Sequence, residues 1–139
     1  MEYTLWEFLQ SDVADGVRQL AGTTDLRQIH IESVSVQELP VDNFIQRDEL
    51  VLSTAVGCLN NQATFRLLIR SVKDAGAAAL FLTFRNSDYM IPSNVVALAN
   101  EIGLPLFSIP WERRFSDIQA TVNGAVREKK LCVYQKLQT

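Results

Sequence analysis

The sequence predicts a mixed α/β fold with a mainly parallel sheet, built from a β-α-β-α-β unit between residues 49 and 111 with flanking helices. Three short apolar segments, 50–52, 79–82 and 106–109, are the predicted strands. The segments between them have helical apolar spacing, and connections of that length join parallel strands. An N-terminal helix and strand pair and a long C-terminal helix complete the predicted fold.

The composition indicates one ordinary domain. The chain has 139 residues, of which 47% are hydrophobic and 21% charged, enough to bury a normal core. No apolar run approaches the roughly 20 residues of a membrane span, and the N-terminus lacks a secretory signal, so we expect a cytoplasmic protein. The net charge of -3 argues against direct nucleic-acid binding by this domain.

The N-terminal elements are predicted from local signals. Thr4 and Glu7 have the spacing of a capping box before a short amphipathic helix. A strand is expected over 17–21, and a second over 29–37, with a bulge or register change near Ser33. The following loop, 41–48, could contain one helical turn at 42–45.

Two helices are predicted between the parallel strands. The first is capped by Asn60 or Asn61 and ends at Gly76, and the second follows Pro92 and ends at Gly103. Their apolar stripes are Phe65, Leu68, Ile69 and Val72, then Val95, Val96, Leu98, Ala99 and Ile102.

A long helix is expected from Phe115 to the end of the chain. Its second half, 128–139, has no visible partner within the domain, which favours pairing with another copy or a link to further domains. We therefore divide the chain into a sensor domain, 1–118, and a C-terminal amphipathic helix, 119–139, and expect a homodimer.

Polar side chains follow each predicted parallel strand. Ser53 and Thr54 follow the first strand, Arg85 the second, and Trp111 and Glu112 the third. Glu38 ends the strand before them. Ligands of open α/β sheets bind at the carboxyl ends of the strands, so these six residues are the candidate ligand-binding site.

Each candidate also has a structural explanation. Glu38 could bond the backbone of the turn at Pro40, and Ser53 and Thr54 could cap the following loop. Arg85 could hold a carboxylate or a urea-like carbonyl, or be solvated. Trp111 could stack on a planar heterocycle or pack under the last helix.

Some of these polar groups fit local structure better than a ligand site. Glu112 could form a local ion-pair cluster with the arginines that follow it. Glu49, at the opposite end of its strand, fits a structural carboxylate that caps or pairs with Arg47.

No catalytic, metal or cofactor site is predicted. The chain has one histidine and two distant cysteines, which disfavours a zinc site and leaves no nucleophile–base pair. His30 fits a surface position on a strand. The segment after Thr54 also lacks the glycines and lysine of a phosphate-binding loop.

Four segments occur in the order typical of one regulator family. They are SVSVQELP (33–40), DELVLST (48–54, then Gly57), AGAAAL (75–80) and IGLPLFSIPWE (102–112). Together they resemble the N-terminal domain of PucR-type purine catabolism regulators, over about residues 3 to 120. The chain departs from the family pattern at Arg47–Asp48, where Gly-Gly is common, and at Val41, where an acidic residue is common.

The resemblance implies a regulatory input domain of a bacterial transcription regulator of purine or related nitrogen metabolism. In such proteins the domain precedes a second regulatory segment and a C-terminal helix-turn-helix, which this chain does not contain. The leading hypothesis is a non-catalytic sensor and dimerisation domain for a purine, ureide or amino-acid-like metabolite. A small enzyme or enzyme accessory domain using the same cleft, and a ligand-free interaction module, are the alternatives.

Overall fold

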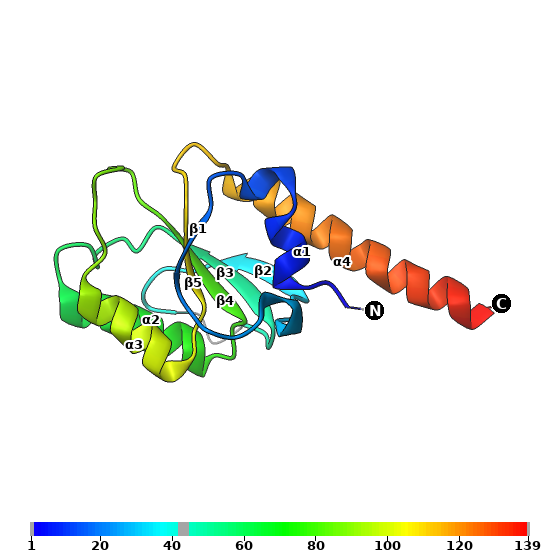
Figure 1. Ribbon diagram of the computed structural model, residues 1–139, viewed down its shortest axis with the longest axis horizontal. Coiled ribbons are helices and arrows are strands. Elements are labelled where there is room, and N and C mark those ends of the chain that lie inside the picture. Colours follow the sequence, from blue (N-terminus) through cyan, green and yellow to red (C-terminus); the bar gives the residue numbers. More distant parts are fainter. Residues whose placement is uncertain (1, 42–44, 139) are drawn as a thin grey trace.

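The computed structural model describes residues 2–41 and 45–138, which form a five-stranded sheet covered by helices on both faces (Figure 1). The strand order is β1-β5-β4-β3-β2. The strands are β1 (Arg18–Ala21), β2 (Ser33–Val36), β3 (Glu49–Ser53), β4 (Ala79–Thr83) and β5 (Leu106–Ile109). The predicted helical turn at 42–45 falls largely outside the described residues.

Four of the five strands run parallel. β2 pairs with β3, β3 with β4 and β4 with β5, all in parallel register, whereas β1 pairs antiparallel with β5. The predicted mixed α/β class and mainly parallel sheet are confirmed. The two N-terminal strands do not pair with each other, because they occupy opposite edges of the sheet.

The predicted strand over 29–37 is too long. Only Ser33–Val36 joins the sheet as β2. The preceding residues pair with the N-terminal segment instead: Ile31 N donates to Tyr3 O at 2.8 Å, and Leu5 N donates to Ile29 O at 2.8 Å. The interruption of the alternating pattern near Ser33 marks this change of partner.

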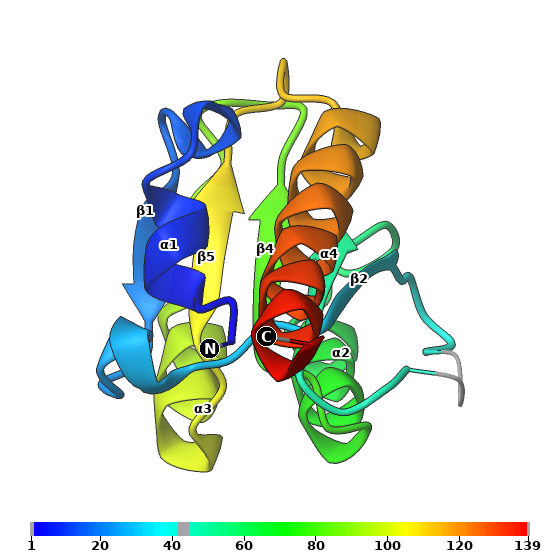
Figure 2. The ribbon, with the colours of Figure 1, turned by 90° about the vertical axis from the view of Figure 1, so that its right-hand side faces the viewer.

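Two layers of helices enclose the sheet. α2 (Gln62–Asp74) and α3 (Ser93–Ile102) lie on one face, and α1 (Leu5–Leu9) and α4 (Phe115–Gln138) on the other (Figure 2). Two short 3-10 helices, η1 (Asp12–Ala14) and η2 (Leu26–Gln28), lie in the N-terminal connections. All residues of β3 and β4 are buried, as expected for parallel strands covered on both faces.

The helices between the parallel strands begin and end at the predicted signals. The Asn61 side chain caps α2 by accepting from Thr64 N, and Gly76 follows its end with φ +96. Gly103 closes α3 in the left-handed conformation. The predicted stripe of α2 is fully buried. In α3, Val95, Leu98 and Ala99 are buried, whereas Val96 and Ile102 are partly buried.

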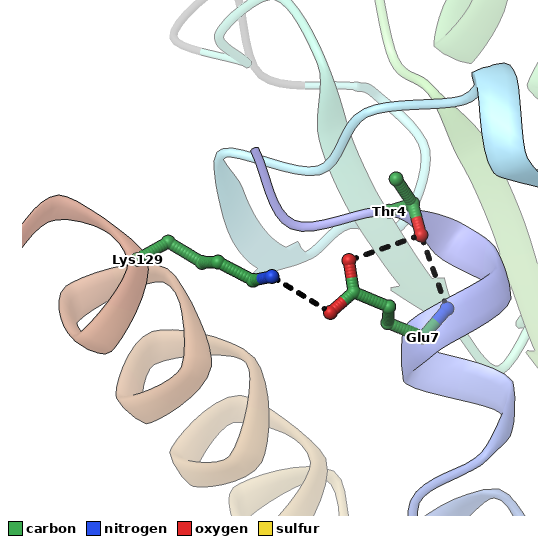
Figure 3. Close-up of polar contacts among 3 residues, drawn as sticks. All are labelled: Thr4, Glu7 and Lys129. Atoms are coloured by element: carbon green, nitrogen blue, oxygen red, sulfur yellow. Dashed lines mark hydrogen bonds and ion pairs between the residues drawn. The ribbon is translucent and has the colours of Figure 1, made fainter. Parts of the chain in front are cut away.

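The N-terminal cap of α1 also holds α4 against the domain. Thr4 Oγ1 accepts from Glu7 N at 3.2 Å and lies 3.4 Å from Glu7 Oε1, and Glu7 Oε2 lies 3.0 Å from Lys129 Nζ (Figure 3). Ile118 and Val122 of α4 are fully buried against the same face of the sheet. The second half of α4 extends past the edge of the domain (Figure 1).

Leu80→Ala is expected to destabilise the domain strongly. Leu80 lies in β4 and is 0% exposed, and removing a fully buried leucine leaves a cavity that costs about 2–5 kcal/mol. Leu67→Ala on α2 is the matched control, because Leu67 is 55% exposed and its loss is expected to cost less than about 1 kcal/mol. Urea unfolding measures both values. Equal losses would contradict the burial of β4.

The two cysteines are expected to differ in thiol reactivity. Cys58 is buried, and this burial together with the nearby Glu38 carboxylate raises the pKa of its thiol, whereas Cys132 is partly exposed. With a disulfide reagent under native conditions, Cys58 is expected to react roughly a hundredfold more slowly than Cys132, since reaction needs local unfolding. The variant Cys132→Ser isolates Cys58. Rapid native labelling of that variant would show that Cys58 is accessible.

Candidate ligand-binding site

The carboxyl ends of β3, β4 and β5 meet at one edge of the sheet, the upper edge in Figure 2. Because β1 runs antiparallel to β5, its first residue reaches the same edge, where Arg18 is the partner of Ser108. This edge therefore collects side chains from the ends of three central strands and from the beginning of an edge strand.

A cavity of about 490 Å³ lies at this edge, within the range of small-molecule sites. Three of the predicted site residues, Arg85, Trp111 and Glu112, line it. The segment 84–91 after β4 supplies much of one wall, and 108–112 supplies another. β1 and the turn before it complete the lining with Gly16, Arg18 and Leu20.

Contacts between loops hold the β1 and β5 side of the cavity in place. Gly16 has φ +84, and a Cβ at this position would lie 2.7 Å from Pro110 Cγ, so the close approach of these turns requires glycine. An Arg113 guanidinium nitrogen donates to Asp15 O at 3.1 Å. Thr83 Oγ1 donates to Ile109 O at 3.0 Å and joins the ends of β4 and β5.

The segment after β4 is anchored by an aromatic pair. The rings of Phe84 and Tyr89 lie 4.8 Å apart between centroids, and Tyr89 Oη donates to Leu59 O at 3.0 Å. Burial, with a smaller contribution from Cys58, raises the pKa of Tyr89, so its hydroxyl remains a donor at neutral pH. This wall is therefore tied to the loop that follows β3.

Glu38, Ser53 and Thr54 form a separate cluster. Glu38 Oε1 accepts from Ser53 Oγ at 2.7 Å, while Glu38 Oε2 accepts from Thr54 Oγ1 at 2.6 Å and from Thr54 N at 2.8 Å. Val56 N is a longer donor to the same carboxylate, at 3.4 Å. The carboxylate thus fastens the end of β2 to the exit of β3, where Ala55 has φ 55.

The six predicted site residues therefore separate into two groups of three. Glu38, Ser53 and Thr54 are not among the residues that line the cavity, and their polar atoms bond one another. The carboxylate of Glu38 accepts the hydrogen bonds at the β3 exit, and Arg85, Trp111 and Glu112 line the cavity.

The surroundings of Trp111 and Glu49 bear on their two alternatives. Trp111 lines the cavity, and its side chain is 47% exposed. Glu49 is 6% exposed and accepts from Gln46 N at 2.9 Å, which agrees with a structural carboxylate.

Sequence reasoning missed Arg18 and Tyr89 as cavity residues. Nothing local to Arg18 reveals that its strand runs antiparallel beside β5. Tyr89 lies in a segment whose course depends on a hydrogen bond to Leu59, 30 positions away in the sequence.

Other functional features are few in the part of the chain that the structure describes. Within residues 2–41 and 45–138, no group of three or more His, Cys, Asp or Glu side chains could hold a metal ion. None of the described helices combines the length and apolarity of a membrane span. The imidazole of His30 pairs with the Glu2 carboxylate, away from the cavity.

One solved structure with a similar chain is the crystal structure of the CBS and DRTGG domains of the regulatory region of Clostridium perfringens pyrophosphatase, complexed with activator, diadenosine tetraphosphate. The two chains are 10% identical, with a TM-score of 0.48, and the match covers 85% of this chain and 47% of that chain. This chain therefore matches about half the length of that one. No curated protein matches the chain.

A family model matches residues 7–126, which include every strand of the sheet and the cavity. The model describes the purine catabolism regulatory protein-like family, PucR. Since the match covers most of its length, the chain belongs to the purine catabolism regulatory protein-like family.

Proposed function

We propose that this chain is the non-catalytic, ligand-sensing and dimerisation domain of a bacterial transcription regulator of purine or related nitrogen metabolism. The cavity at the carboxyl edge of the sheet carries the proposal, because Arg85, Trp111 and Glu112 line it together. Membership of a family of regulatory proteins supports the regulatory role. The ligand is a small purine, ureide or amino-acid-like metabolite.

The chemistry of the cavity suits recognition of a planar polar molecule. The Trp111 indole offers a surface for stacking, Arg85 offers a planar set of donors, and Glu112 offers acceptors. Glu38, Ser53 and Thr54 support the site from outside it, because they fix the exit of the neighbouring strand β3.

The same residues disfavour catalysis. The cavity lining contains no histidine or cysteine, and the single histidine of the chain, His30, lies elsewhere. Its serines, Ser87 and Ser108, therefore have no imidazole base beside them in the cavity. A site without a base that titrates near neutral pH fits binding better than turnover.

The C-terminal helix is the proposed output element. α4 begins at Phe115, three positions after Glu112, so the cavity wall continues almost directly into the helix. Ligand binding would change the packing of residues 119–139 and pass the change to a DNA-binding domain outside this chain. The domain itself does not bind nucleic acid, and a regulator of this kind works in the cytoplasm.

A second copy of the chain is the proposed partner of α4. Leu131 and Leu137 are 52% and 81% exposed on the projecting half of the helix. Residues 127–139 contain four basic side chains and one acidic side chain, a net charge of +3. The chain total is -3, so residues 1–126 carry -6. A basic helix with exposed leucines is complementary to the acidic body of another copy.

A thermal-shift panel of purines, ureides and amino acids tests the sensor function. A ligand at a hundredfold excess over its Kd is expected to raise the melting temperature by about 5–10 °C, because it binds only the folded state. Arg85→Gln and Trp111→Ala are expected to weaken binding by about tenfold each. Arg70→Gln on the exposed face of α2 is the matched charge control.

The variant Glu38→Gln tests whether Glu38 stabilises the β3 exit without binding the ligand. It is expected to lower stability by about 1–3 kcal/mol without abolishing the ligand response, because an amide cannot satisfy all the donors at the β3 exit. Silence across the panel would favour a ligand-free interaction module. Product formation from a bound ligand would favour an enzyme.

Light scattering tests the dimer. The wild-type chain is expected to have twice the monomer mass, and the double variant Leu131→Glu/Leu137→Glu the monomer mass, since both side chains are exposed and needed only by a partner. Gln135→Glu, also exposed on α4, controls for added charge. A wild-type monomer, or a dimer that withstands the double substitution, would remove this part of the proposal.

A further inference from the structure

Two arginines, one from the loop after β4 and one from the edge strand β1, line the same cavity. Arg85 follows β4, whereas Arg18 begins the antiparallel edge strand β1. Both side chains are exposed. Within the described ranges, neither guanidinium forms an ion pair or a hydrogen bond. A chain with a net charge of -3 thus leaves two cations without a carboxylate partner at its cavity.

The charge balance of the cavity points to an anion. Its lining contains two guanidinium groups and a single carboxylate, that of Glu112, which gives a net charge of +1. Like charges that face a common space repel each other, and an anion between them removes the repulsion and gains charge-assisted hydrogen bonds. A planar carboxylate matches the fork of a guanidinium better than a spherical ion does.

The remaining polar group sets a second requirement. Glu112 is exposed and has no partner among the described residues, and a carboxylate accepts hydrogen bonds but cannot donate them. A ligand that satisfies it must carry N–H donors. Trp111, 47% exposed beside it, offers an aromatic face to a flat ring.

We infer that the ligand of this cavity is a planar nitrogen heterocycle that bears a carboxylate: Arg18 and Arg85 bind the carboxylate, Trp111 stacks on the ring and Glu112 accepts from its N–H groups. This inference rests on the proposed ligand-sensing function and narrows its ligand class. It also gives the antiparallel strand β1 a role, because Arg18 reaches the cavity only through that pairing.

Three pairs of compounds test the inference by calorimetric titration of the full chain. They are orotate, imidazole-4-carboxylate and purine-6-carboxylate, each compared with its own carboxamide, which keeps the ring and its N–H groups but removes the charge. At least one carboxylate is expected to bind, with its carboxamide at least about tenfold weaker. Raising the salt concentration is expected to weaken the binding of the carboxylate and to leave the binding of the carboxamide almost unchanged.

Variants assign the effect to the two arginines. Arg18→Gln and Arg85→Gln are each expected to weaken binding of the carboxylate by roughly tenfold. Each is also expected to reduce the protein's preference for the carboxylate over the carboxamide. Arg70→Gln removes the same charge from the exposed face of α2 and is expected to change neither the carboxylate affinity nor the preference for the carboxylate. Both cavity arginines are exposed, and circular dichroism melting of each variant checks that the fold is retained.

The possible failures are distinguishable. If carboxamides, or uncharged purines and ureides, bind as tightly as the carboxylates, the inference of an anionic ligand is overturned while the sensor function stands. Carboxylate binding that survives both arginine substitutions would also overturn it. The absence of binding by these compounds and by the wider panel would overturn the sensor function and the inference together.

Discussion

The burial of the central strands on both faces is the constraint on which the structure depends. Every residue of β3 and β4 is buried, so neither strand can present a polar side chain to solvent along its length. Helices must cover both faces, and Phe81 illustrates the packing, with its ring 4.5 Å from Phe107 and 5.4 Å from Phe8 between centroids. Polar side chains that could contact a ligand are therefore confined to the ends of these strands.

The polar groups at the end of β3 and those at the ends of β4 and β5 are bonded differently. At β3, the Glu38 carboxylate accepts from two hydroxyls and one backbone amide at 2.6–2.8 Å and so completes the local hydrogen bonding. At β4 and β5, the loops are fastened through backbone carbonyls and aromatic contacts, which leaves the guanidinium of Arg85 and the carboxylate of Glu112 uncommitted. Polar residues at strand ends are thus structural on one strand and available on its neighbours.

Much of the fold could be predicted because its signals are local. The α2 stripe, the Asn61 cap and the glycines after α2 and α3 are each readable within one element. The parallel direction of β3, β4 and β5 follows from the length of their connections. The position of β1 beside β5 and the partner of Glu38 depend on contacts across many residues, so the sequence could not reveal Arg18 or the separation of the predicted site into two groups.

The short distance in sequence between the cavity and α4 has a mechanical consequence. α4 has 24 residues and is therefore about 36 Å long, and it starts three positions after Glu112. Its first turns pack on the sheet through Ile118 and Val122, and Lys129 in its second half pairs with Glu7 of α1. The rest of the helix extends past the edge of the domain (Figure 1). A tilt of about 5° at the sheet-bound end would move the tip by about 3 Å, so small shifts of the cavity wall would be magnified along the helix.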